Sequence, residues 1–144
     1  MIVNLNHTGF VVQNLDKAVA FYRDVIGLSL IRDVERKGSS ISQILGYNDA
    51  HIKAAVMDLG NDCGLELIEY LSPIPGSRPS NERAVLGGSH IAFNVDNIES
   101  TFSQLVEGGA VNLNPPSEVA PGRYVCYMQD PCGNWIELIE DKGG

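Results

Sequence analysis

The order of apolar and polar residues repeats once along the chain. The segment His-Thr-Gly-Phe-Val-Val that begins at His7 is matched by His-Ile-Ala-Phe-Asn-Val beginning at His90. Counted from each histidine, the residue at offset two is small, the residue at offset three is Phe, and apolar residues stand at offsets eight, twelve and fifteen. The last three offsets have the four-then-three spacing of one helix face. Each copy therefore predicts a strand, a short turn and an amphipathic helix.

The ends of the two predicted helices agree with this alignment. Asn14 and Asn97 stand at equivalent positions just before the helices, where a side-chain oxygen can accept a hydrogen bond from an unpaired backbone N–H group. Glycine follows each helix, Gly27 in the first copy and Gly108-Gly109 in the second, as helix C-termini favour. We expect the helices over residues 15–26 and 98–107.

The remaining segments complete two similar halves. In the first half, strands are expected at residues 6–12, 28–36, 51–59 and 64–70, with a short apolar stretch at 41–45. In the second half, strands are expected at residues 89–95, 110–113, 124–129 and 135–140. The last of these follows a tight turn, because Asp130-Pro131-Cys132-Gly133-Asn134 supplies the backbone angles that a turn needs. These elements define an N-terminal module at 4–71, a proline-rich linker at 72–88 and a C-terminal module at 89–141.

Alternation along the strands separates the two faces of each predicted sheet. In the first strand of each copy, bulky apolar residues lie on the face opposite the histidine, where the helices are expected to pack. Each histidine shares its own face with a small residue. In the two acidic strands, Glu66 and Glu137 occupy equivalent positions, whereas Glu69 and Glu140 lie on the opposite face. The alternation therefore selects one glutamate from each acidic strand.

Composition limits the class of protein. A chain of 144 residues with 44% hydrophobic content suits a single domain with a substantial core. The net charge of −8 and the pI near 4.7 argue against nucleic acid or an anionic membrane as partner. No apolar run reaches membrane-spanning length and the start lacks the basic residues of a secretory signal, so a cytoplasmic location is expected. The cysteines, predicted to be reduced thiols, are Cys63, Cys126 and Cys132.

The selected residues, His7, Glu66, His90 and Glu137, form a candidate metal site. Two imidazoles and two carboxylates suit Zn, Ni, Co, Mn or Fe(II) and leave positions for two substrate oxygens. Such a metal stabilises an enediolate or enolate, and a carboxylate that leaves it can take the carbon-bound proton. Glu66 and Glu137 are therefore also the candidate catalytic bases. The alternative is that the histidines are polar groups in a solvated cleft, but their place in a duplicated pattern favours the metal.

Several segments resemble the vicinal-oxygen-chelate superfamily, which includes glyoxalase I, methylmalonyl-CoA epimerase, extradiol dioxygenases and the fosfomycin and bleomycin resistance proteins. The matching segments are the His7 strand, Ala20-Phe21-Tyr22-Arg23-Asp24, Ile26-Gly27-Leu28, His90-Ile91-Ala92-Phe93, and Asp130-Pro131 to Glu137-Leu138. The resemblance implies an α+β fold in which two βαβββ modules form an open, cup-shaped mixed β-sheet barrel with helices outside and a divalent metal inside. In the glyoxalase I and epimerase branches, the four ligands match His7, Glu66, His90 and Glu137.

The resemblance also suggests where a small-molecule substrate binds. Arg123 and Asn134 flank the closing hairpin, where the family often holds substrate carboxylates or phosphates. A plain surface role is the alternative for both, and for Arg78 and Arg83 in the linker, because exposed arginine is common. His51 has no counterpart in the second module and is expected to lie at a strand edge on the surface.

Three classes of function follow from the resemblance. A metal-dependent isomerase, lyase or epimerase acting next to the carbonyl of a hemithioacetal or acyl thioester is favoured by Glu66, the fourth ligand. An extradiol dioxygenase normally uses two histidines and one carboxylate from one module of a longer chain. A metal-free binding or resistance protein usually lacks the full ligand set. The Asp-Pro-Cys-Gly turn resembles that of glyoxalase-like members, but the choice between glyoxalase I and epimerase stays open. A homodimer is expected, because a partner often covers the strand edges of such modules.

Overall fold

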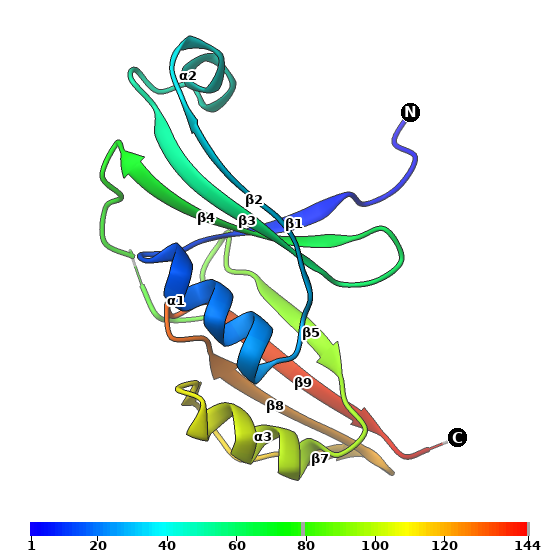
Figure 1. Ribbon diagram of the computed structural model, residues 1–144. Helices are drawn as coiled ribbons and strands as arrows, with labels where there is room; N and C mark the ends of the chain where they lie inside the picture. The colour runs from blue at the N-terminus through cyan, green and yellow to red at the C-terminus, as the bar shows by residue number, and fades with distance from the viewer. Residues whose placement is uncertain (79, 144) are drawn as a thin grey trace. The chain divides into compact units, whose positions relative to one another are not determined.

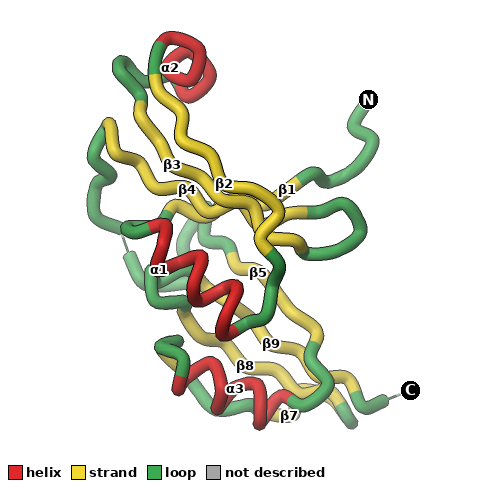
Figure 2. The backbone as a smooth tube through the Cα atoms, viewed as in Figure 1, coloured by secondary structure: helices red, strands yellow, loops and turns green. Residues whose placement is uncertain are grey.

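The computed structural model describes residues 1–78 and 80–143. This part of the chain is of mixed α and β type and contains two open sheets, one of four strands and one of five (Figure 1). The residues form two compact units, Met1–Ser77 and Arg78–Gly144. Along the chain, residues 73–78 and 80–89 connect the last strand of the first sheet to the first strand of the second. These residues form neither helix nor strand (Figure 2). No helix in the described ranges is both long enough and apolar enough to cross a membrane.

The first unit contains four strands and three short helical segments. In chain order the elements are β1 (His7–Val11), α1 (Leu15–Ala20), η1 (Phe21–Val25), β2 (Leu30–Lys37), α2 (Ser39–Leu45), β3 (His51–Asp58) and β4 (Gly64–Ser72). The strand order in the sheet is β1-β4-β3-β2. β1 runs parallel to β4, and the other neighbouring strands are antiparallel. The first strand of the unit therefore hydrogen-bonds to the last, and β3 and β4 form an antiparallel hairpin.

The second unit repeats this topology. Its strand order is β5-β9-β8-β6, with β7 also paired to β8, and β5 runs parallel to β9 as β1 does to β4. In chain order the elements are β5 (His90–Asn94), α3 (Ile98–Glu107), β6 (Val111–Asn112), β7 (Ser117–Ala120), β8 (Arg123–Gln129) and β9 (Trp135–Asp141). The repeat in the sequence is thus a repeat of strand order and direction.

Some segments differ from the prediction. The helix expected at 15–26 is α-helical only in its first part and continues as the π-helical turn η1, in which the Ile26 N–H donates to the Phe21 carbonyl at 3.1 Å. The apolar stretch at 41–45 belongs to α2. The sequence pattern does not predict β7, because all four of its residues are exposed and give no alternation of buried and exposed positions.

One face of each sheet is buried beneath a helix of the same unit. α1 packs against β3 and β4, and α3 packs against β9. On the buried faces Phe10, Leu67 and Leu138 are at most 8% exposed. His7 and His90 are exposed, as expected for the opposite face. We call the face of each sheet that carries its histidine the open face.

Side-chain caps fix the start of each helix. Asn14 Oδ1 accepts a hydrogen bond from the Lys17 N–H at 2.9 Å, and Asn97 Oδ1 accepts one from the Ser100 N–H at 3.0 Å. The two predicted caps are therefore confirmed.

Glu69 and Glu140, which lie on the buried faces of the two sheets, hold the helices against the strands. Glu69 Oε2 accepts a hydrogen bond from the Leu15 N–H at 2.9 Å, and Glu140 Oε2 accepts one from the Ile98 N–H at 3.0 Å. Each carboxylate thus joins an acidic strand to the positive end of the helix that covers it. Because side chains alternate along a strand, Glu66 and Glu137 lie on the open faces instead.

Candidate functional site

In the first unit, the pairing of β1 with β4 brings His7 and Glu66 together on the open face. The parallel register sets Gly9 opposite Glu66 and His7 opposite Gly64, so the histidine and the glutamate are diagonal neighbours. Their side chains meet, with His7 Nε2 3.3 Å from Glu66 Oε2. A Cβ atom at Gly9 would lie 4.0 Å from the same oxygen. A small residue at this position therefore borders the carboxylate without crowding it.

The second unit repeats the arrangement at the same register. Ala92 lies opposite Glu137, and His90 lies opposite Trp135. His90 Nε2 is 3.0 Å from Glu137 Oε2. The two histidine side chains are 42% and 44% exposed and the two glutamate side chains 25% and 15%, in chain order. Each unit therefore presents one His–Glu pair on its open face.

The atoms that meet in each pair suit a shared cation. A neutral imidazole nitrogen and a carboxylate oxygen both present lone pairs, so a close approach requires a proton or a metal ion between them. The other ring nitrogen of His7, Nδ1, is 2.7 Å from Asn6 Oδ1. An amide oxygen can only accept, so this contact favours the tautomer with the hydrogen on His7 Nδ1, and Nε2 is the atom that faces Glu66. Imidazole nitrogen together with carboxylate oxygen is a donor set that divalent metals use widely.

Each unit supplies two of the four predicted ligands. Across residues 1–78 and 80–143, no group of three or more His, Cys, Asp or Glu side chains is arranged to hold a metal ion. The donor chemistry of the two pairs fits a divalent metal, and the sharing of one ion by both pairs stays a prediction.

Tyr127 and Arg83 lie beside the second pair. The Tyr127 ring is edge-on to the His90 ring, with centroids 5.2 Å apart, and it lies opposite Glu137 on the neighbouring strand. Burial raises the pKa of Tyr127, and the nearby Glu137 carboxylate raises it further. The Arg83 guanidinium carbon lies 4.3 Å from the Tyr127 ring centroid and 5.1 Å from that of Trp135. The phenol of Tyr127 thus stays protonated at neutral pH.

Neither Tyr127 nor Trp135 stands out in the sequence by its residue type. Their place could be found by counting outward from the tight turn, because residues equally far from Cys132 pair across the β8–β9 hairpin. This count sets Tyr127 opposite Glu137, as the observed register does. The same count cannot place Arg83, because Arg83 lies in an aperiodic segment whose contacts strand spacing does not predict.

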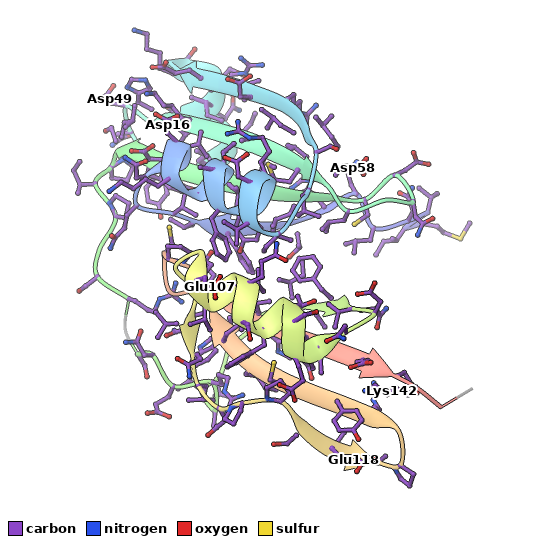
Figure 3. All side chains as sticks on the ribbon, turned by 60° about the horizontal axis from the view of Figure 1, so that its bottom comes forward. Asp16, Asp49, Asp58, Glu107, Glu118 and Lys142 are labelled. Carbon is purple, nitrogen blue, oxygen red and sulfur yellow. The ribbon has the colours of Figure 1, made fainter. Side chains whose placement is uncertain are left out.

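The strand next to Glu66 carries a less polar residue than the strand next to Glu137. Val56 lies opposite Glu66, in the position that Tyr127 has in the second unit. Burial raises the pKa of Tyr70, which is further along β4, and nearby Tyr47 and Glu66 add to the shift. A pocket of about 570 Å³ borders His7 and extends to Asp58 at the end of β3, labelled in Figure 3. His7 therefore borders an open hollow within its own unit.

The two predicted substrate-binding residues have partners within the second unit. Arg123 Nη1 is 3.3 Å from Asp141 Oδ2, where β8 begins and β9 ends. It is four residues from Tyr127, about 13 Å at the rise of a strand. Asn134 is 6% exposed and its Nδ2 donates to Asp130 Oδ2 at 2.9 Å. A substrate role for these side chains stays a prediction.

Other polar residues also have structural contacts. Arg78 Nη2 donates to Asn134 Oδ1 at 2.9 Å, which ties the linker to the tight turn. His51 is paired with Glu35 on β2 and its side chain is 29% exposed. The three cysteines are free thiols, as predicted. Burial raises the pKa of the Cys126 thiol to about 11, so this cysteine is protonated and unreactive at neutral pH.

A comparison with known families decides what these paired modules are. The model of the Glyoxalase/Bleomycin resistance protein/Dioxygenase superfamily matches residues 4–138, a span that includes both His–Glu pairs. The chain belongs to this superfamily. Members of the glyoxalase superfamily commonly bind a divalent metal. The resemblance noted in the sequence is thereby confirmed, and so is the mixed α+β fold.

Individual members of the glyoxalase superfamily resemble most of the chain. A probable lactoylglutathione lyase of Vibrio cholerae is 32% identical over 94% of this chain and 89% of its own length. A 2-epi-5-epi-valiolone epimerase of an Actinomyces species is 29% identical over 99% of this chain and 81% of its own length. The crystal structure of a glyoxalase family protein from Bacillus cereus gives a TM-score of 0.86 over 99% of this chain and 97% of that one, at 22% identity. The structural likeness establishes the fold, and the named relatives are a lyase and an epimerase.

Proposed function

We propose that the chain is a metal-dependent isomerase, lyase or epimerase that transfers a proton at the carbon next to a carbonyl group. The observation that supports this most directly is the repetition of one His–Glu pair at the same parallel register in both units, with nitrogen–oxygen distances of 3.3 and 3.0 Å. A repeat of strand topology alone would not require the same two chemical groups at the same place.

The four residues that would hold the metal are His7, Glu66, His90 and Glu137. A divalent ion bound to them supplies Lewis-acid stabilisation of the negative charge that develops on the substrate's carbonyl oxygen. The donor set suits Zn, Ni, Co, Mn or Fe(II). Asn6 contributes by keeping His7 Nδ1 protonated, so that Nε2 remains the binding atom.

The proton is carried by a carboxylate of the chain. Glu66 or Glu137 takes the proton from the substrate carbon, and the electron pair of the broken C–H bond moves toward the carbonyl group. In an isomerisation the same carboxylate then returns the proton to the neighbouring carbon. In an epimerisation the other glutamate, in its protonated form, delivers a proton to the opposite side of the same carbon. Both glutamates are partly exposed on open faces, where a substrate can reach them.

The substrate class follows from the named relatives. One relative is named a probable lactoylglutathione lyase and another a 2-epi-5-epi-valiolone epimerase. We therefore propose a small molecule with an α-hydroxy carbonyl or acyl-thioester group, such as a hemithioacetal. Arg123 and Asn134 remain candidates to bind its anionic part.

Metal content tests the ligand set. Protein purified without chelator is analysed for bound divalent metal, in the wild type and in the variant His7→Ala plus His90→Ala. We expect the double variant to lose the metal, because carboxylates alone do not hold a transition metal comparably. His51→Ala is the matched control, since it changes the third histidine of the chain outside both pairs and should retain the metal. Stoichiometric metal in the double variant would contradict the proposal.

The reaction class is tested in deuterated water with hemithioacetal, acyl-thioester and catechol substrates. A proton-transferring enzyme should place deuterium at the substrate's α-carbon during turnover. A divalent metal held by all four residues would have room for two substrate oxygens but not for a bidentate substrate and O₂ together. Oxygen consumption in step with loss of a catechol, unchanged by Glu66→Gln, would establish the dioxygenase alternative. Binding of a small molecule without turnover would establish the binding-protein alternative.

We also propose that the protein is a homodimer. Each sheet is open, and its edge strands leave backbone groups available to a partner. Solution scattering at micromolar concentration should give the mass of two chains. A monomer mass would refute this.

A further inference from the structure

Another hollow, of about 450 Å³, lies on the open face of the second unit. Val125 and Tyr127 are two residues apart on β8 and therefore share a face, and Tyr127 lies opposite Glu137. The hollow is thus adjacent to the His90–Glu137 pair. We call it the β7–β8 pocket, and its lining includes Arg83, Leu113, Pro115, Val119, Val125 and Tyr127.

The lining of the β7–β8 pocket combines an apolar wall with one charged group. Leu113, Pro115, Val119 and Val125 supply hydrocarbon surface, and Arg83 supplies a positive charge. Among the described residues that line the pocket, none is acidic. Small-molecule sites are commonly apolar hollows with a few polar groups that fix the ligand's orientation. In a chain with a net charge of −8, this lining favours a ligand that is anionic at one end and apolar along its body.

Arg83 is held by aromatic rings and not by a carboxylate. Its guanidinium carbon lies 4.3 Å from the Tyr127 ring centroid and 5.1 Å from that of Trp135. Stacking on a ring uses the flat face of a guanidinium, so the N–H donors at its rim stay available to a ligand. Within the described part of the chain Arg83 forms no ion pair, whereas Arg123 is paired with Asp141.

A compact turn positions the backbone of Arg83. The Gly88 N–H donates to the Val85 carbonyl at 2.9 Å. A Cβ atom at Gly88 would lie 2.6 Å from the Arg83 carbonyl oxygen and 2.9 Å from that of Val85, so this close approach requires glycine. The turn ends directly before β5, the strand that begins at His90. The fold therefore places Arg83 in sequence and in space beside the second His–Glu pair.

We propose that the β7–β8 pocket binds a carboxylate-bearing, otherwise apolar part of the substrate and that Arg83 recognises its negative charge. This inference rests on the proposed function and narrows its substrate class to anions with a hydrocarbon portion. The carboxylate accepts hydrogen bonds from the guanidinium, and the hydrocarbon portion packs on Val119 and Val125. A molecule bound in this way lies next to Glu137, because Tyr127 borders both the pocket and the glutamate.

The probe that tests the pocket is hexanoate, with hexanamide as the neutral analogue of equal length. Affinity is measured by titration calorimetry, and the fluorescence of Trp135, the only tryptophan of the chain, reports on the surroundings of Arg83. Arg83→Met removes the charge and keeps an apolar stem. It should weaken hexanoate binding about tenfold and leave hexanamide binding unchanged, which also shows that the pocket remains folded. The matched control is Arg36→Met, since Arg36 lies on β2 of the other unit.

The remaining variants separate the charge from the apolar wall. Arg83→Lys should bind hexanoate with intermediate affinity, because it keeps the charge but not the planar fork of donors. Val119→Ser should weaken the binding of hexanoate and not that of acetate. No saturable hexanoate binding to the wild type would overturn the inference. The same conclusion would follow if Arg83→Met kept the preference for hexanoate over hexanamide, or if Arg123→Met alone abolished it.

The binding measurements need no turnover, so this inference and the proposed function fail in different ways. A wild-type protein that binds hexanoate through Arg83 but transfers no proton would contradict the proposed function alone. An active enzyme that does not bind hexanoate would contradict the inference alone.

Discussion

Opposite Glu66 the neighbouring strand carries Val56, whereas opposite Glu137 it carries Tyr127. The residue paired with the histidine differs as well, since it is a glycine in the first module and a tryptophan in the second. The backbone register of the His–Glu pair is nevertheless the same in both. Strand pairing therefore sets which two groups meet, and the next strand sets which side chain lies beside the glutamate.

The largest expected effect is on catalysis. Removal of a general base typically costs about 10²–10⁴ in rate, so Glu66→Gln and Glu137→Gln should each lower kcat by that order. The two variants are compared by the rate of deuterium incorporation and by the affinity for Zn²⁺. Identical losses of rate and of affinity in both variants would show that the two carboxylates are interchangeable.

A smaller but sharp effect is expected at Gly64, the counterpart of Trp135. A Cβ atom there would lie 2.6 Å from Val56 Cγ1. Gly64→Ala should therefore lower the free energy of unfolding by about 1–3 kcal/mol, the usual cost of overpacking. Val56→Ala in the same chain should relieve most of this loss in a denaturant titration. Gly9→Ala is the control, because its nearest contact is an ordinary 3.9 Å and the second module has alanine there.

The sequence predicts the parts of this molecule that depend on period and register. Each expected strand contains or overlaps an observed one, and residues 98–107 form the helix α3 as predicted. The His–Glu pairs could be selected because strand alternation distinguishes Glu66 from Glu69. Exposed β7 could not be predicted, since it has no buried face. Arg83 could not be placed on Tyr127, because an aperiodic linker carries no register.

Glu69 and Glu140, on the buried faces of the two sheets, should contribute differently to stability. Glu140 is 6% exposed and is also 3.2 Å from Lys142 Nζ, whereas Glu69 is only partly buried. Leaving a buried N–H group without a partner costs about 1–3 kcal/mol, and water can replace the partner where the site is exposed. Glu140→Ala should therefore lower the free energy of unfolding more than Glu69→Ala. A denaturant titration giving the opposite order would contradict this.

The smallest effects are expected where the modules are alike. Asn14 and Asn97 make equivalent caps, with hydrogen bonds of 2.9 and 3.0 Å to the third residue after each. Replacing either by alanine should cost about 1 kcal/mol of stability, the typical value for a lost helix cap. Neither change should alter Zn²⁺ affinity, because the caps lie at the helices and not on the open faces. If the two modules unfold in one transition, the losses should add in the double variant, since the caps share no partner. Two separate unfolding transitions, each shifted by only one of the substitutions, would instead show that the two modules unfold independently although their folds are alike.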